Sequence, residues 1–211
     1  MCRGGFHPLP EDGPLNRAGT LVLVGNAGPD LWRAFERGRR DEPDPLDRWT
    51  RRLVSAAAVE LGASAALFPF DGPPYHPFQR WALKADRVHP SPLGILIHPD
   101  FGLWHAYRAA LCFEARLALP ARPMESSPCD GCRDRPCLTA CPVSAFSVNG
   151  YEVDGCANHV SSAAGTSCRE QGCLARHACP VGQAYRYVPA QAGFHMAHFL
   201  TSRHPRPKAK P

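Results

Sequence analysis

Cysteine is the residue type whose spacing in this sequence most directly suggests chemistry. Eight of the 10 cysteines fall between Cys129 and Cys179. They form two runs, CDGCRDRPCLTACP and CREQGCLARHACP, with Cys156 alone between them. Residues 1–10 hold no apolar secretory core, and dense cysteine in a reducing compartment points to metal or redox chemistry before disulfides. The Cys-Pro ending that both runs share suggests an internal duplication.

The spacing within the runs predicts two 4Fe–4S clusters that exchange one ligand. Each cubane needs four thiolates, and a tight loop supplies three of them more easily than the fourth. In two-cluster ferredoxins the cysteine before the proline ligates the other cluster. By this rule the first cluster takes Cys129, Cys132, Cys137 and Cys179, and the second takes Cys141, Cys156, Cys168 and Cys173. All eight clustered cysteines are then used.

The runs also depart from the bacterial ferredoxin pattern, which has two residues between its second and third cysteines. Here four residues fill each corresponding gap, and five precede the last Cys-Pro. Two four-cysteine zinc sites are the main alternative, because they could use the same residues. Disulfides are a third reading. Of the two remaining cysteines, Cys112 lies in an apolar run and is expected in the core, and Cys2 receives no role.

Composition and charge exclude several classes of protein. Hydrophobic residues make up 44% and charged residues 20%, which is ordinary for a globular chain. The 23 prolines and 18 glycines favour short elements and many loops. We expect no transmembrane helix and a cytoplasmic location. The net charge of +5 comes from the end of the chain, since no acidic residue follows Glu170. We therefore expect a solvated basic tail and no nucleic-acid or membrane partner.

The chain before the cysteines has the pattern of a mixed helix and sheet layer. We expect an irregular lead-in over 1–18, a domain over 19–122, a cluster domain over 123–188, and a C-terminal helix and tail over 189–211. Within the first domain, apolar runs and turn residues predict strands at 20–25, 63–68, 94–98 and 104–119, and helices at 29–39, from 45 to about 61, and at 79–85.

The segment ILIHPDFGLWHAYRAALCF, residues 95–113, resembles the CblC family of cobalamin-processing proteins, which shows an I-H-P-x-F-G-x-W-x-A-x-R pattern. The matching positions are Ile97, His98, Pro99, Phe101, Gly102, Trp104, Ala106 and Arg108. The family's arginine lies near its thiol-cofactor and cobalamin site. The resemblance therefore implies that Arg108 binds a cofactor, with Trp104 and Tyr107 lining a flat cofactor face. The alternatives are an arginine that pairs with a carboxylate, and aromatic rings that pack in the core.

The chain also resembles the epoxyqueuosine reductases, which join a related corrinoid-binding, nitroreductase-like domain to a C-terminal two-cluster ferredoxin module. The shared features are Cys141-Pro142, Ala145, the Tyr-Glu-Val-Asp segment at 151–154, and Cys156. The resemblance covers roughly residues 20–181. The family's catalytic segment, with an acidic residue before the strand matching 94–98, is absent, so epoxyqueuosine is not the expected substrate.

Together these features predict an α+β protein, with a nitroreductase-like, CblC-like domain followed by a small loop-rich, ferredoxin-like domain. The predicted function is single-electron transfer through two 4Fe–4S clusters to an acceptor bound by the N-terminal domain. The alternative is a corrinoid reductase that binds cobalamin, followed by a zinc-stabilised interaction module. A flavin site follows from the resemblance alone. The expected partners are redox donor and acceptor proteins, and no catalytic residue is assigned.

Overall fold

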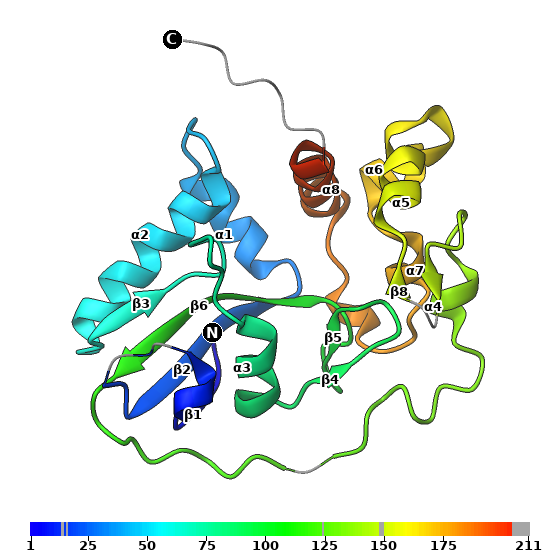
Figure 1. The fold of residues 1–211 in the computed structure, drawn as a ribbon. Helices are drawn as coiled ribbons and strands as arrows, with labels where there is room; N and C mark the ends of the chain where they lie inside the picture. The colour runs from blue at the N-terminus through cyan, green and yellow to red at the C-terminus, as the bar shows by residue number, and fades with distance from the viewer. Residues whose placement is uncertain (14, 16, 124, 148–149, 204–211) are drawn as a thin grey trace. The chain divides into compact units, whose positions relative to one another are not determined.

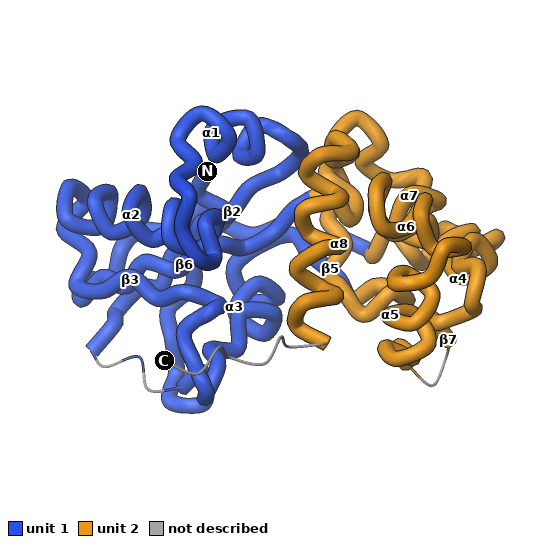
Figure 2. Tube along the Cα trace, turned by 90° about the horizontal axis from the view of Figure 1, so that it is seen from above, with its two compact units in different colours: residues 1–89, 105–126 blue, residues 90–104, 127–211 orange. Residues whose placement is uncertain are grey.

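The protein is described by a computed structural model that covers residues 1–211 except 14, 16, 124, 148–149 and 204–211. The chain forms two compact units, shown in different colours in Figure 2. Unit 1 contains residues 1–89 and 105–126, and unit 2 contains residues 90–104 and 127–211. Each unit therefore combines segments from two parts of the sequence.

Unit 1 is built on an antiparallel sheet of four strands. In spatial order these are β1 (Cys2–Phe6), β2 (Thr20–Ala27), β6 (His105–Phe113) and β3 (Ala65–Leu67). The two central strands are the apolar runs that the sequence predicted. Their register pairs Leu23 with Ala110, and a bulge follows Val24.

Helices cover both faces of this sheet (Figure 1). On one face α2 (Pro45–Glu60) packs Val54 and Ala58 against Ala109 and Leu111 of β6. Helix α1 (Asp30–Gly38) contacts β2 and α2. On the other face, α3 (Phe78–Ala85) approaches β1 so closely that a Cβ at Gly4 would lie 2.0 Å from the backbone oxygen of Ala85.

The first residues are not the irregular lead-in that the sequence predicted. Residues 2–6, CRGGF, form β1 at the edge of the sheet, and a short 3-10 helix, η1 (Pro10–Asp12), follows. The strand was missed because it has two glycines and no β-branched residue. It is held by Arg3, whose buried guanidinium contacts Asp86 at 2.7 Å.

Unit 2 consists of short elements, as the proline and glycine content predicted. Its helices and strands are β5 (Leu96–Ile97), α4 (Pro136–Thr139), β7 (Phe146–Ser147), β8 (Gly150–Tyr151), α5 (Val153–Ser161), η2 (Ala163–Gly165), α6 (Thr166–Gln171), α7 (Leu174–His177), η3 (Gln183–Tyr185) and α8 (Pro189–Arg203). Strand β4 (His89–Pro90) pairs with β5, and β7 pairs with β8. The predicted C-terminal helix is α8, whereas residues 204–211 of the predicted basic tail lie outside the described residues.

The segment 90–104 belongs to unit 2, although the sequence assigned it to the first domain. Its apolar side chains, Leu93, Ile97 and Leu103, share a buried cluster with Cys137 and Cys179. The predicted boundary at 122–123 falls a few residues before the observed one at 126–127. The unit to which a segment belongs depends on contacts with residues far away in the sequence. The local periodicity of the segment does not indicate those contacts.

Two glycines bring the backbones of this segment and the last cysteine run into direct contact. A Cβ at Gly102 would lie 2.0 Å from the backbone oxygen of Val181, and a Cβ at Gly182 would lie 2.2 Å from the carbonyl carbon of Phe101. Both glycines have positive φ, +56° and +70°. Glycine is required at both positions because any side chain would overlap backbone atoms. Among the described residues, no helix has the length and apolarity needed to cross a bilayer.

Candidate functional site

The eight clustered cysteines of unit 2 gather in two groups of four. None of the 10 cysteines is in a disulfide bond. In the first group, which we call quartet A, burial and then the neighbouring thiols raise the pKa of Cys129 and Cys137. The thiols of Cys179 and Cys132 raise the pKa of Cys129. Those of Cys179, Cys129 and Cys132 raise the pKa of Cys137. Quartet A therefore consists of Cys129, Cys132, Cys137 and Cys179.

The second group, quartet B, consists of Cys141, Cys156, Cys168 and Cys173, and these four side chains line one cavity. Burial is again the first cause of the raised pKa values of Cys156, Cys168 and Cys173. The neighbouring thiols raise these values further: Cys141 raises the pKa of Cys156, and Cys156 raises the pKa of Cys168 and of Cys173. Each quartet thus includes one cysteine from the other run, and in both quartets this is the cysteine that precedes a proline. The structure brings together the same residues that the crossed assignment placed around each cluster.

Backbone N–H groups point at several of these sulfurs. The amide of Ala145 donates to Cys141 Sγ at 3.3 Å. Cys173 accepts from the amides of Ala175 and Arg176, and Cys179 accepts from Val181. Such donors stabilise a thiolate and the sulfurs of a bound cluster. They arise because each cysteine lies next to the first turn of a short helix or a tight turn, where amides have no intrahelical partner.

One side-chain donor also reaches quartet B. The hydroxyl of Tyr151, on β8, hydrogen-bonds the sulfur of Cys156. Burial and then this sulfur raise the pKa of the phenol well above its usual value, so the group remains a donor at neutral pH. The ring stacks on Phe146 with centroids 4.7 Å apart and 13° between planes. Phe146 itself lines the quartet B cavity.

Apolar side chains pack against part of quartet A, in which Cys137 and Cys179 are buried while Cys129 and Cys132 are partly exposed. The buried cluster contains Leu93, Ile97, Leu103, Ala175 and two of the cysteines, with Leu138, Phe146 and Val181 packed against it. A shell of this kind lowers the local dielectric and limits solvent access. The donor set and its surroundings fit an iron–sulfur cluster in each quartet. Within the described residues, no three His, Cys, Asp or Glu side chains form a group able to hold a single metal ion.

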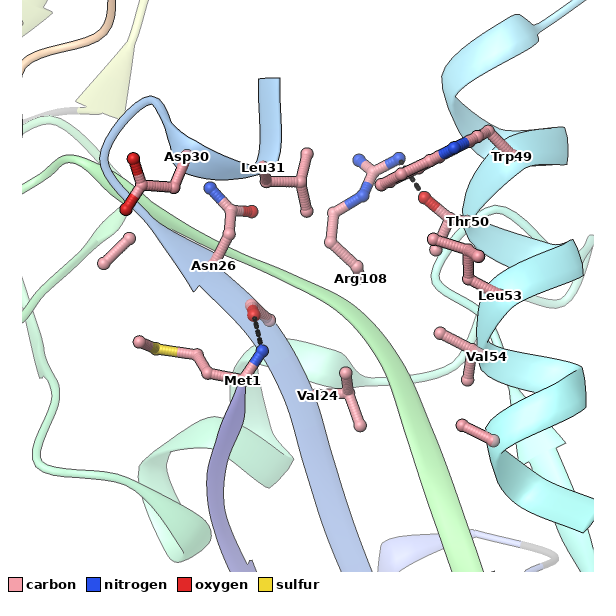
Figure 3. Close-up of a pocket in the computed structure, with 13 residues that line it drawn as sticks. Met1, Val24, Asn26, Asp30, Leu31, Trp49, Thr50, Leu53, Val54 and Arg108 are labelled. Atoms are coloured by element: carbon pink, nitrogen blue, oxygen red, sulfur yellow. Dashed lines mark hydrogen bonds between the residues drawn. The ribbon is translucent and has the colours of Figure 1, made fainter. Parts of the chain in front are cut away.

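Unit 1 contains a separate feature, a largely apolar cavity of about 470 Å³ above β2 and β6 and beside α2 (Figure 3). Its walls come mainly from Val24, Leu31, Trp49, Leu53, Val54 and Ala57. Asn26, Asp30, Thr50 and Arg108 add polar groups. Arg108 is the residue that the family resemblance had singled out.

The guanidinium of Arg108 is anchored at one corner of this cavity. Its Nη2 donates to Asp47 Oδ1 at 2.7 Å and to Thr50 Oγ1 at 3.4 Å. Its Nε is buried and has no hydrogen-bond partner among the described residues. The carboxylate pairing that the sequence left open for Arg108 is therefore present, and one donor of the same side chain remains available.

Trp104 and Tyr107, which the resemblance implied would line a cofactor face, are not among the described residues that line this cavity. Trp104 belongs to unit 2, is 1% exposed, and packs against Tyr187 and His177 with Arg176 over its ring. Tyr107 belongs to unit 1, but its hydroxyl donates to Asp86 Oδ2 at 2.8 Å, and it is not among the described residues that line the cavity. Both rings have the packing role that was the alternative.

Several residues of these sites carried only weak signals in the sequence. Tyr151 was noted as part of a shared segment, yet nothing local indicates that its hydroxyl reaches Cys156. Trp49 and Leu53 read as ordinary helix positions, and Asn26 as a turn residue. Only the packing of α1 and α2 on the sheet turns them into walls of one cavity. Cys112 is buried as expected, and Cys2 is exposed.

Comparison with known proteins gives one likeness. No family model matches the chain, and no curated protein matches its sequence. The structure is similar to that of epoxyqueuosine reductase from Streptococcus thermophilus, with a TM-score of 0.51 and 15% sequence identity. The match covers 88% of this chain and 58% of that one, so the present chain spans little more than half of its structural relative. At this identity the likeness is one of fold.

Proposed function

We propose that this chain is an iron–sulfur electron-transfer protein that carries two 4Fe–4S clusters, one in each cysteine quartet. The observation that supports this most directly is the grouping of eight thiols into two sets of four, each with one member from the other run. This is the ligand exchange known from two-cluster ferredoxins. When bound, each cluster supplies one-electron redox chemistry.

The residues of the chain have distinct tasks in this function. The eight thiolates hold the clusters. The amides of Ala145 and Val181, together with the Tyr151 hydroxyl, donate to ligand sulfurs and thereby set the reduction potential. The apolar side chains of Leu93, Ile97 and Leu103 shield two ligands of quartet A, Cys137 and Cys179, from water. We propose a redox donor protein upstream and an acceptor bound by unit 1 downstream, with no nucleic acid or membrane as partner.

Anaerobic purification with quantitation of iron, acid-labile sulfide and zinc tests the proposal. Two clusters of four require about eight iron and about eight sulfide per chain, with a broad visible absorption that bleaches on reduction. A colourless protein with stoichiometric zinc and no sulfide would establish the zinc-stabilised module instead.

The second candidate is a corrinoid reductase, which the fold of the epoxyqueuosine reductase neighbour favours. Reduction of cobalt is a one-electron step and suits a cluster relay. The cavity beside Arg108, at about 470 Å³, would hold only part of a corrinoid. Titration of cobalamin under reducing conditions separates the two functions. A change in the corrinoid spectrum supports the reductase, whereas no binding and no spectral change leaves the plain electron carrier.

A further inference from the structure

The cavity of unit 1 has the properties of a small-molecule site. Its volume of about 470 Å³ lies within the range of pockets that enclose drug-sized ligands. Aliphatic side chains from β2, α1 and α2 form most of the wall, and the Trp49 indole forms another part. Figure 3 shows Leu31, Leu53 and Arg108 around the same space. A mostly apolar body is the ligand that such walls would accept.

The polar groups define the other half of the ligand. The Arg108 side chain is 15% exposed, and its buried Nε has no hydrogen-bond partner among the described residues. A buried N–H without an acceptor is costly, so this donor favours a ligand with an oxygen acceptor. In Figure 3 the Asn26 side chain also points toward this space.

The charges indicate that this acceptor is neutral. The Arg108 cation is already paired with Asp47 at 2.7 Å. The wall itself holds one further group of each sign, the Met1 ammonium, which donates to the Gly25 carbonyl, and the Asp30 carboxylate. The charges around the cavity are therefore balanced, and a charged ligand would disturb that balance. A carbonyl oxygen satisfies the free N–H without burying another charge.

We propose that this cavity binds a neutral compound of one or two fused rings that presents a carbonyl oxygen to Arg108, and that its class is the quinones. The choice of quinones among cyclic ketones rests on the proposed function, because a quinone is also an electron acceptor. In that role one quinone would take two electrons and two protons from solvent to give the hydroquinone. Two reduced clusters would supply the electrons, and the donor protein would restore them.

Anaerobic isothermal titration calorimetry of the intact, oxidised protein tests binding without electron transfer. The probe is 2,3-dimethyl-1,4-naphthoquinone, whose ring positions next to the carbonyls are blocked against addition of the 10 cysteine thiols. We expect saturable binding of one molecule per chain. The soluble anion 2-naphthoate should bind at least 10-fold more weakly. Absence of saturable quinone binding, or tighter binding of the naphthoate, would overturn the inference.

Three variants locate the site. Arg108→Met should weaken quinone binding roughly 10- to 100-fold, the range for loss of a hydrogen bond to a charged group. Ala57→Phe fills the cavity from α2 and should abolish binding. Val59→Phe, on the same helix at a position that is 81% exposed, is the matched control and should bind as the parent does. Equal binding by Ala57→Phe and the parent contradicts the site.

Two further measurements keep the outcomes separable. Circular dichroism of each variant shows whether unit 1 remains folded, and a misfolded Arg108→Met leaves the Ala57→Phe and Val59→Phe pair as the deciding comparison. Iron and sulfide content of the same samples reports on the proposed function. A protein with full clusters and no quinone binding refutes the ligand alone, whereas quinone binding without clusters refutes the electron-transfer function alone.

Discussion

The hydroxyl of Tyr151 donates a hydrogen bond to the sulfur of Cys156, while its ring lies stacked on Phe146. Pairing of Phe146 with Tyr151 across β7 and β8 fixes this position. The described contacts give quartet A no tyrosine in the same role. The two quartets are thus chemically different, although each is made of four cysteines.

This contact predicts a difference in reduction potential that one oxygen atom controls. A hydrogen bond to a ligand sulfur strengthens as the cluster gains negative charge, so it favours the reduced state. Tyr151→Phe keeps the ring stack and removes the donor, and should lower the potential of the quartet B cluster by about 30–100 mV, where 59 mV corresponds to about 1.4 kcal/mol for one electron. An EPR-monitored redox titration measures the shift. Tyr185→Phe, whose ring contacts Phe101, is the control and should leave both potentials unchanged. A shift of both clusters, or of neither, contradicts the assignment.

The exchange of ligands between the two runs predicts which thiols each serine variant releases. Cys141→Ser should expose the remaining cysteines of quartet B, and Cys179→Ser those of quartet A, because a cluster lacking one ligand is lost more readily. Alkylation under anaerobic conditions followed by mass spectrometry identifies the released thiols. Cys2→Ser, at an exposed position outside both quartets, is the control. Release of Cys129, Cys132 and Cys137 by Cys141→Ser would mean that each run keeps its own ligands.

The contact between Gly102 and Val181 predicts a large loss of stability in unit 2. Gly102→Ala places a Cβ 2.0 Å from a backbone oxygen, so the two segments must separate, and we expect a cost of about 3 kcal/mol or more. Gly94→Ala is the matched control, since its φ is +72° but no atom lies within 4 Å of the added Cβ. It should cost only about 1 kcal/mol from backbone strain. Urea unfolding followed by the cluster absorption measures both, and equal losses would show that φ alone matters.

Tyr107 predicts a dependence of unit 1 stability on alkaline pH. Burial, and then the carboxylate of Asp86, raise the pKa of this phenol far above its usual 10. The unfolded chain therefore loses this proton first as the pH rises. The stability contributed by the neutral phenol is complete below pH 10 and falls by about 1.4 kcal/mol per pH unit above it.

Tyr107→Phe should remove this part of the pH dependence. At neutral pH the variant is less stable by about 1–3 kcal/mol, because Asp86 loses a hydrogen bond. The gap between the two proteins should narrow between about pH 10 and 11.5 in urea unfolding experiments. Tyr75→Phe, at a residue that is 66% exposed, should not alter the slope. A gap that stays constant with pH would show that the Tyr107 proton is not linked to folding.

The sequence by itself determined the features that depend on residue type and short-range order. Apolar runs gave the two central strands, β2 and β6, and helical periodicity gave α2 with its start at Asp44-Pro45. The cysteine spacing predicted the two quartets, because ligand exchange leaves no clustered thiol unused. The fold class, a mixture of helix and sheet, followed from the same patterns. That the thiols hold iron stays a prediction for the metal analysis.

Only the tertiary structure decided which distant segments meet. CRGGF is an edge strand because Arg3 finds Asp86, 83 residues away in the chain. The family resemblance implied that Trp104 lines a cofactor face, whereas in the structure its ring packs against Tyr187 and Arg176 within unit 2. The contact of Tyr151 with Cys156 and the cavity around Arg108 likewise could not be predicted from the local sequence. Periodicity indicates which face of a helix or strand is apolar. Which other segment covers that face is decided by long-range packing, and no single segment of the sequence contains this information.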